Sequence, residues 1–358
     1  MNLREKERLN TVNAQHMTAK FEGWIRLDMA QLQNVNELLE RTRFILGDAL
    51  LDVDRRFESE LASDNPFVHD INEHTRRFRG KRLRPLLCLL TAHAVGKLTE
   101  AHHILAAVVE MIHTATLIHD DVLDDADVRR HVATVHVRWS NQTSVLYGDY
   151  LFTHAFHLAA STGSVEACRI IGRATNRVCE GELMQTRSGG NLHLTEKDYF
   201  SIIDGKTAEL CAVSCEIGAR YADAGDAVVA ALERYGRNLG KAFQIADDVL
   251  DLVGIESSVG KTLGTDLAQQ KLTLPIIRLL NNSPAEIRDK VLGWLESGSD
   301  EDCRQIARTA REQGAIDDSL ATARACADAA RRELQILPPS SARDILMQLP
   351  TMSIDRSC

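Results

Sequence analysis

The sequence predicts an all-α protein that forms one domain of about ten or more helices. Only seven of the 358 residues are proline, and none lies between Pro85 and Pro275, so no proline interrupts helix formation over this long stretch. Apolar residues recur there at three- and four-residue spacing, as in 104–115. The alternation of Val, Ile and Thr that is typical of strands is nearly absent.

The elements can be assigned in order along the chain. Residues 1–25 are polar and are expected to form a loosely held N-terminal extension to a domain that spans 26–358. An amphipathic pattern from about 30 to 63 predicts a first long helix. Beyond about Ser283, sequence rich in Ala, Arg and Glu predicts shorter surface helices. Between these parts, glycine-containing breaks predict helices of roughly 15 to 30 residues, with breaks near Gly96, Gly163, Gly189–Gly190, Gly225 and 254–264.

Composition and charge exclude several classes of protein. The net charge of −9 argues against a nucleic-acid partner held by bulk electrostatics. The N-terminus has no apolar segment of the secretory kind, and no uninterrupted apolar run reaches the roughly 20 residues of a membrane span. The eight cysteines form no CxxC pair and are expected to be reduced thiols. We therefore expect a cytoplasmic protein.

The same acidic pattern, DDxxD, occurs at 120–124 and again at 247–251, each time within apolar sequence. In a helix the first and last Asp of each copy lie on one face, about one turn apart. One such copy alone is typical of a solvated helix face, but two copies of identical spacing are not. Carboxylates this close repel each other unless a cation lies between them, and Mg²⁺ prefers oxygen ligands. The candidate metal ligands are Asp120, Asp121, Asp124, Asp247, Asp248 and Asp251.

Basic residues lie close to both acidic motifs. The segment 79–85 holds four bases and a glycine, and Arg129–Arg130 directly follow the first motif. Three further lysines lie on either side of the second acidic motif in the sequence, namely Lys206, Lys261 and Lys271. Arg and Lys are the usual phosphate-binding side chains. Bases placed beside paired acidic motifs indicate a phosphate ester that is bridged by metal ions.

At this point the chain resembles the trans-isoprenyl diphosphate synthases, and within them the long-chain polyprenyl group that includes octaprenyl diphosphate synthases. The resemblance spans about residues 79–277, with motifs in the family's order. Arg79, His131 and Gln270 stand where family members often have glycine. The matching segments are GKRLRP (80–85), IHTATLIHDDVLDDADVRR (112–130), CEGELMQ (179–185), GKTAEL (205–210), FQIADDVLD (243–251), GKTLGTD (260–266) and KLTLP (271–275).

The resemblance implies a fold and a role for each matching residue. It implies an isoprenoid-synthase-like bundle around a central active-site cavity, with Mg²⁺ on the six aspartates chelating the diphosphate of an allylic substrate. The residues implied to contact that diphosphate are Arg129, Lys206, Thr207, Gln244, Lys261 and Lys271. Those implied to bind isopentenyl diphosphate are Lys81, Arg84, His113 and Arg130.

The implied chemistry needs no nucleophilic side chain. The allylic C–O bond breaks, the homoallylic double bond attacks the resulting cation, and a proton leaves to give the next allylic diphosphate. Metal ions and fixed cations stabilise the departing pyrophosphate, which is itself a plausible base. We therefore assign no catalytic His or Ser.

Residues upstream of the first motif are candidates for setting product length. Each helical turn rises about 5.4 Å, close to one isoprene unit. The first turn before Asp120 offers Ala115 and Thr116, and the second offers Met111 and Ile112. Short-chain members have an aromatic residue at the first of these positions, so we expect a long-chain product, heptaprenyl to decaprenyl. Geranylgeranyl and farnesyl diphosphate synthases are the alternatives.

Two other functions would account for part of the same pattern. A class I terpene cyclase ionises the same kind of substrate but needs no isopentenyl diphosphate site, against which Lys81, Arg84 and Arg130 argue. A non-catalytic synthase subunit usually lacks part of an acidic motif, whereas both are intact here. The resemblance also implies a homodimer and a product that partitions to membranes.

Overall fold

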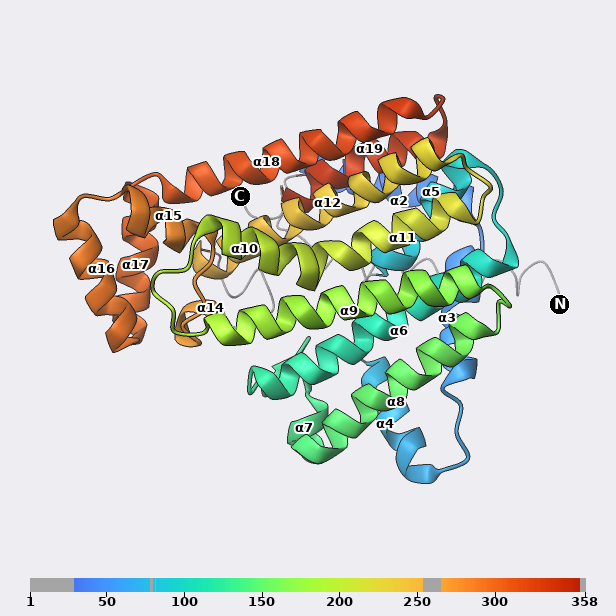
Figure 1. Ribbon diagram of the computed structural model, residues 1–358, viewed down its shortest axis with the longest axis horizontal. Helices are drawn as coiled ribbons and strands as arrows, with labels where there is room; N and C mark the ends of the chain where they lie inside the picture. The colour runs from blue at the N-terminus through green and yellow to red at the C-terminus, as the bar shows by residue number, and fades with distance from the viewer. Residues whose placement is uncertain (1–28, 78–79, 81, 254–264, 355–358) are drawn as a thin grey trace.

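The computed structural model describes residues 29–77, 80, 82–253 and 265–354, and nearly every element in these ranges is a helix (Figure 1). The predicted all-α fold is confirmed. The extension predicted at 1–25 lies outside the described residues. The first half of the chain forms α2 (Met29–Leu46), α3 (Ala49–Glu60), α4 (Pro66–Arg76), α5 (Leu83–Val95), α6 (Glu100–Leu123), β1 (Val128–Arg129), β2 (Val132–Ala133), α7 (Val135–Arg138), α8 (Asn141–Ala160) and α9 (Val165–Ser188).

The second half of the chain is helical in the same way. One short element, η1, is a single turn of π-helix between α10 and α11. The elements are α10 (Glu196–Ile203), η1 (Asp204–Ala208), α11 (Glu209–Arg220), α12 (Asp226–Val253), α14 (Thr265–Ala268), α15 (Leu274–Asn282), α16 (Ala285–Ser297), α17 (Asp300–Glu312), α18 (Ala315–Glu333), η2 (Leu334–Ile336) and α19 (Ser341–Ile354).

Helix α6 lies in the larger of two hydrophobic cores and ends at the first acidic motif. Its N-terminus is capped reciprocally by Thr99 and His102. The residues from Ile104 to Ile112 are buried on every side of the helix, as expected for a core helix packed by α3, α5 and α8. Among the described residues α6 alone is long and apolar enough to cross a membrane, but most of it is buried inside the fold.

Helix α12 is the second long helix and ends just after the second acidic motif. It packs against α11 on one side and α18 on another (Figure 1). Its apolar face contributes to both cores, through residues such as Tyr235 in the first and Ile245 in the second. Because α6 and α12 are both fixed by extensive burial, the two acidic motifs stand on rigid elements.

The predicted glycine breaks are confirmed where the structure describes them. Gly96 caps α5, Gly163 lies between α8 and α9, and Gly189–Gly190 follow α9. Gly225 directly precedes α12. The break predicted at 254–264 lies outside the described residues.

Two predictions about the ends of the fold were wrong. The single helix predicted from about 30 to 63 is two helices, α2 and α3, because Gly47 adopts a left-handed φ of +52° between them. The part beyond Ser283 is not limited to shorter surface helices. Helix α18 packs along α12 and buries one apolar face that includes Ile316 and Leu320.

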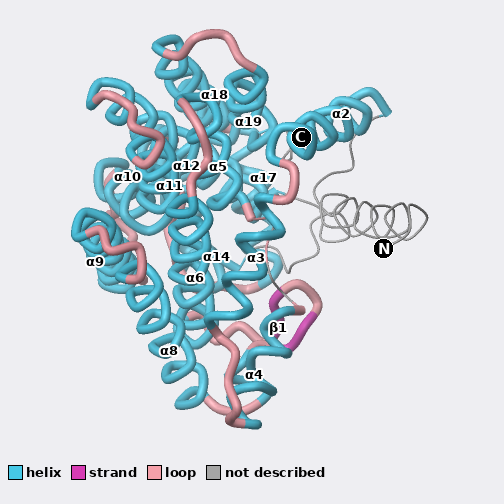
Figure 2. Tube along the Cα trace, turned by 90° about the vertical axis from the view of Figure 1, so that its right-hand side faces the viewer, coloured by secondary structure: helices cyan, strands magenta, loops and turns pink. Residues whose placement is uncertain are grey.

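A two-residue hairpin follows the first acidic motif, which the sequence analysis did not predict. β1 and β2 pair antiparallel, with Val128 opposite Ala133 and Arg129 opposite Val132. The turn residues Arg130 and His131 have φ of +52° and +64°, as a type I′ turn requires. Helix α4 lies beside the hairpin (Figure 2), and the His74 ring nitrogen Nε2 donates to the Ala133 carbonyl at 2.7 Å.

Candidate active site

Both acidic motifs lie at the carboxyl ends of their helices. Asp120 and Asp121 occupy the last turn of α6 and Asp124 is its C-cap, while Asp251 lies in the last turn of α12. The helix dipole places partial negative charge at this end, where carboxylates are unfavourable and cations are favourable. Each motif therefore lies where its own helix would repel it, and a positive partner must offset this cost.

In the first motif each aspartate contacts a basic side chain. Arg129 on the hairpin donates to Asp121 from Nε at 2.8 Å and from Nη2 at 2.7 Å. Lys206 of η1 places its Nζ 3.5 Å from Oδ2 of Asp120. Lys271, which follows α14, donates to Oδ1 of Asp124 at 2.7 Å.

In the second motif, the contacts described for Asp248 and Asp251 come from neutral donors. Asp248 is buried and accepts hydrogen bonds from Tyr199 Oη at 2.6 Å and from Gln244 Nε2 at 2.7 Å. Asp251 accepts one from the backbone N–H of Asp266 at 3.2 Å. Asp247 is half-buried.

Residues of the π-turn η1 join the two motifs. Lys206 reaches the first motif at Asp120, and Thr207 donates to Gln244 Oε1 at 2.7 Å, whose amide binds Asp248. The sequence places these groups far apart, and the fold brings them into one continuous set of contacts. π-turns often occur at functional sites, because the extra residue redirects neighbouring side chains.

The turn η1 can pack directly against α9 and α12 because a glycine, which has no side chain, lies at each contact. A Cβ on Gly181 of α9 would stand 2.5 Å from the backbone N of Lys206. On the other side, a Cβ on Gly240 of α12 would stand 2.6 Å from Cα of Ala208. Both distances are far below normal contact, so any side chain at either position would displace the turn.

Burial shifts the pKa of several of these groups. It raises the pKa of Asp120 to about 6, although Lys206 acts in the opposite direction. Burial likewise raises the pKa of Asp121 against the effect of Arg129. The pKa of Asp248 lies well above its ordinary value because of burial and the nearby Asp266 carboxylate. Such carboxylates gain from an added positive charge.

The acidic residues fit a hard divalent cation that binds waters and substrate phosphates in addition to carboxylates. Oδ2 of Asp121 is buried and accepts no hydrogen bond from any described residue, so this oxygen is available as a ligand. In the described ranges, no three His, Cys, Asp or Glu groups meet closely enough to hold a metal ion by themselves. Mg²⁺ does not require this, because it usually binds one or two carboxylates and completes its shell with waters and substrate phosphates.

A second cluster is strongly basic. His113 on α6 is surrounded by Arg84, Arg129 and Arg130, with Arg82 also near, and burial together with these guanidinium groups holds its pKa well below the ordinary value. Nε of Arg84 is buried and has no hydrogen-bond partner among the residues that the structure describes. This cluster of like charges would bind an anion such as a diphosphate.

Arg130 of this cluster lies against the chain that precedes α5. The residue as a whole is exposed, yet its guanidinium packs on Gly80, where a Cβ would stand 2.9 Å from Nη2. The pKa of Arg130 is lowered, chiefly because its guanidinium is buried and also because the positive charge of Arg129 lies near it.

Not every base near this cluster is available to a ligand. Arg82, which the sequence places among the four bases of 79–85, is buried and binds Asp54 at 2.6 Å and Glu110 at 2.8 Å. It anchors α3 and α6 to the start of α5. Lys81 and Lys261, both predicted ligands, lie outside the described residues.

The residues predicted to set product length are in the core of α6. Ala115, Ile112 and Met111 are fully buried, and Thr116 is half-buried with its hydroxyl bound to the His113 carbonyl at 2.8 Å. They precede Asp120 on the same helix, in the direction that leads away from the acidic motifs.

The structure adds site residues that the sequence analysis did not nominate. Glu182 and Gln185 bind Lys206 Nζ at 2.6 Å and 2.7 Å, and both lie within the CEGELMQ segment, so the signal was present. Gln269 donates to the carbonyl of Asp124 at 2.7 Å. Tyr199 contacts Asp248 from outside any recognised motif, and nothing in the sequence pointed to it.

Known proteins resemble this chain along most of its length. The family model for polyprenyl synthetase matches residues 65–311. An all-trans-nonaprenyl-diphosphate synthase (geranyl-diphosphate specific) from Rhodobacter capsulatus is 34% identical, covering 85% of this chain and 94% of that protein. Octaprenyl diphosphate synthase from Escherichia coli K12 is 32% identical, with 91% and 99% covered. A short chain isoprenyl diphosphate synthase from Methanothermobacter thermautotrophicus is 35% identical, with 80% and 89% covered.

A solved structure agrees in fold. The crystal structure of a polyprenyl synthase from Caulobacter crescentus CB15, complexed with calcium and isoprenyl diphosphate, superposes with a TM-score of 0.83 at 36% identity, covering 89% of this chain and 98% of that one. The family match covers well over half of the chain and includes both acidic motifs and the basic cluster. The chain therefore belongs to the polyprenyl synthetase family of prenyltransferases.

Proposed function

We propose that this protein condenses an allylic diphosphate with isopentenyl diphosphate to make a long-chain all-trans polyprenyl diphosphate, heptaprenyl to decaprenyl. The observation that carries the proposal is the set of contacts from Asp120 through Lys206, Thr207 and Gln244 to Asp248. It brings two acidic motifs and a lysine to one place, as the binding of a diphosphate with divalent cations requires.

The six aspartates would hold Mg²⁺, which when bound supplies positive charge to a departing pyrophosphate. The allylic diphosphate would lie between the motifs, where Lys206, Thr207, Gln244 and Lys271 converge. Arg129 is placed to contact the same diphosphate from the hairpin. These fixed donors stabilise the leaving group without reorganising during the reaction.

Isopentenyl diphosphate would bind at the basic cluster, with Arg84, His113 and Arg130 around its diphosphate. His113 is neutral near pH 7, because burial and the surrounding arginines lower its pKa, so it can donate one hydrogen bond without adding charge. The adjacent positions of Arg129 and Arg130 on one turn would place the two diphosphates side by side. Lys81 and Lys261 are proposed to add further contacts, on the resemblance alone.

The long product is supported by the small and apolar residues before Asp120. Ala115 occupies the first turn, where an aromatic residue would stop a growing chain early. The nonaprenyl and octaprenyl synthases among the relatives favour the same reading. A short product, farnesyl or geranylgeranyl diphosphate, is the second candidate, and the short-chain relative favours it.

The family resemblance also supports a cytoplasmic homodimer whose product partitions to membranes. We propose that residues 26–358 form the catalytic domain and that α8 and α9 contribute to the dimer interface. Both helices expose large apolar side chains to solvent, among them Leu146, Phe156 and Leu183. Sedimentation of the purified protein tests this, and a monomer at micromolar concentration would contradict it.

The test of function is incubation with Mg²⁺, radiolabelled isopentenyl diphosphate and, separately, geranyl, farnesyl and geranylgeranyl diphosphate, with products sized by chromatography. A ladder that ends at seven to ten isoprene units is expected. A matched Ala115→Phe variant should shorten the product, with Ala115→Val as the control of similar shape. A wild-type product that ends at geranylgeranyl would favour the short-chain candidate. No incorporation with any primer would contradict the synthase and favour a terpene cyclase or a non-catalytic subunit.

A further inference from the structure

One arginine of α12, Arg237, contacts the side chains at both ends of the π-turn η1. The backbone N–H of Glu209 donates to the carbonyl of Asp204, which is the i to i+5 bond that defines the turn. The side chains of the same two residues are bridged by Arg237, whose Nη1 lies 2.9 Å from Asp204 Oδ2 and whose Nη2 lies 2.8 Å from Glu209 Oε2. One guanidinium thus joins both ends of the turn.

Arg237 is itself fixed in orientation. Glu233, one helical turn earlier on α12, accepts from Nε at 2.9 Å and from Nη2 at 2.6 Å. Glu209 is buried and Arg237 is largely shielded, so these contacts are formed where water competes little. The surrounding carboxylates raise the pKa of Arg237 further despite its burial, and the group stays charged at every accessible pH.

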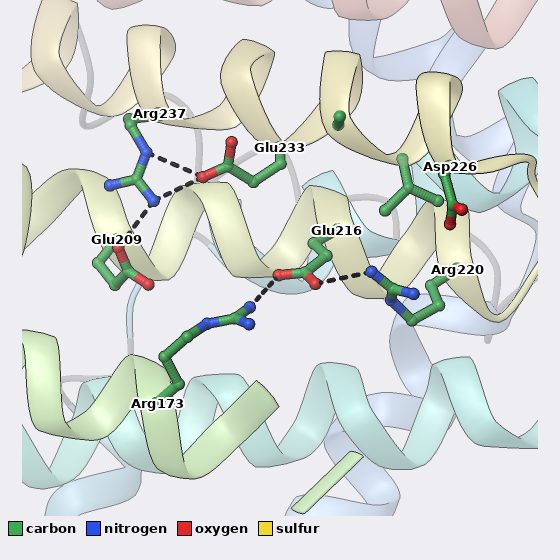
Figure 3. A pocket seen from close by; sticks show the side chains of 9 residues that line it. Arg173, Glu209, Glu216, Arg220, Asp226, Glu233 and Arg237 are labelled. Atoms are coloured by element: carbon green, nitrogen blue, oxygen red, sulfur yellow. Dashed lines mark hydrogen bonds and ion pairs between the residues drawn. The ribbon is translucent and has the colours of Figure 1, made fainter. Parts of the chain in front are cut away.

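Figure 3 shows Arg237 with Glu233 and Glu209 at one end of a cavity of about 340 Å³ between α9, α11 and α12. At the other end of the same cavity Glu216 binds Arg173 at 2.6 Å and Arg220 at 3.2 Å, without contact to the turn. The cavity therefore holds two separate arginine–glutamate groups, of which only one touches η1.

From this geometry we propose that Arg237 is a positioning residue for diphosphate binding: it holds η1 so that Lys206 and Thr207 face the acidic motifs. The proposal rests on the proposed function, in which these two residues contact the allylic diphosphate. A lysine cannot replace Arg237, because a single ammonium cannot reach two carboxylates at fixed spacing as a planar fork does. Lys241, at 2.8 Å from Asp204 Oδ1, holds only the first end of the turn.

The experiment compares Arg237→Met and Arg237→Lys with Arg173→Met, which breaks an ion pair in the same cavity without touching the turn. We expect both Arg237 variants to raise the KM for the allylic diphosphate about tenfold, with the KM for isopentenyl diphosphate changed less than twofold. Arg173→Met should leave both values unchanged. Circular dichroism checks that each variant is folded. If Arg237→Met does not fold, Arg237→Lys still allows the test, because it keeps the positive charge.

A double-mutant cycle separates positioning from a general structural role. Affinity is measured by calorimetry with an allylic analogue whose bridging oxygen is replaced by sulfur, in the presence of Mg²⁺. If Arg237 acts through the turn, Arg237→Met should weaken binding in the wild type but have little further effect in a Lys206→Ala background. The inference would be overturned if Arg237→Met weakened binding by the same factor in the Lys206→Ala background as in the wild type. Equal rises in the KM for the allylic diphosphate and the KM for isopentenyl diphosphate would also overturn it. Wild-type protein without turnover would instead overturn the proposed function, so the two failures are distinguishable.

Discussion

Lys271 donates a 2.7 Å hydrogen bond to Asp124, although 147 residues separate them in the sequence. The segment that follows the second acidic motif is therefore in contact with the first motif. Gln269, two residues earlier, adds a bond to the Asp124 carbonyl at 2.7 Å. These contacts join the residues that follow α14 to the C-terminal end of α6.

Removing the charge of Lys271 should weaken binding of the allylic diphosphate. We expect Lys271→Met to raise its KM about tenfold or more, because a hydrogen bond to a charged group is worth about 1.5–3 kcal/mol. Gln269→Leu is the matched control, which removes a neutral bond from the same segment and should cost less. Steady-state kinetics with saturating isopentenyl diphosphate measure both. Equal effects of the two changes would show that the ammonium charge is not what matters.

The ion pair between Arg129 and Asp121 should matter for stability as well as for binding. Asp121 is 1% exposed, so Arg129→Gln leaves a buried carboxylate without its partner. Because Arg129 is itself partly exposed, we expect a loss of about 2 kcal/mol in the free energy of unfolding, below the range for fully buried pairs. Urea denaturation measures it. The double change Arg129→Gln with Asp121→Asn should recover part of the loss, and a fully additive loss would contradict the pairing.

Two buried histidines should make stability fall at acid pH. His74 donates from Nε2 to Ala133 and accepts at Nδ1 from Arg138 at 2.9 Å, while Nδ1 of His102 accepts from the Thr99 N–H. Burial lowers both pKa values below 6.5. Depressed pKa values mean that this stability is present above about 6.5 and is lost as the pH falls through the lowered values.

Urea denaturation between pH 7.5 and pH 5 tests this dependence. Each unit of lowered pKa corresponds to about 1.4 kcal/mol at the acid end. Replacing both residues, His74→Gln with His102→Gln, should reduce the slope of unfolding free energy against pH, and the slope that remains includes the contribution of His113, whose pKa is also lowered by burial. A double variant as pH-sensitive as the wild type would falsify the assignment.

Gln270 adopts a left-handed backbone with φ of +53°, a conformation that favours glycine. A residue with a Cβ costs about 1–2 kcal/mol in this region. We expect Gln270→Gly to leave stability unchanged or to raise it by up to about 1 kcal/mol, and Gln270→Val to lower it. Thermal unfolding of the two variants measures the difference. A loss of stability with glycine and none with valine would contradict the assignment of strain.

Local patterns in the sequence were sufficient to predict the helical fold and to recognise the two acidic motifs. The helical spacing and most glycine breaks follow from local residue types, and the helices form where these patterns predicted them. The division between α2 and α3 was missed, because apolar periodicity continues past Gly47 and only its left-handed φ ends the helix.

What could not be predicted depends on contacts between distant segments. Arg82 looks like its basic neighbours in the sequence, yet Asp54 and Glu110 bury it in ion pairs. Tyr199 becomes part of the site only because the fold brings its hydroxyl to Asp248, 49 residues away in the sequence. The π-turn was not predicted, and the side chains at its two ends are joined by Arg237 from another helix.

Gly181 and Gly240 lie on opposite sides of η1 and contact its backbone directly. Neither residue touches a substrate in the proposed reaction, and neither has a functional group. In a survey of all single substitutions scored for activity, these two positions should nevertheless rank among the least tolerant, alongside the aspartates. Even alanine should fail there, so a variant found in nature with alanine at Gly181 would be expected to have changed residues on α9 or α11 that restore the spacing.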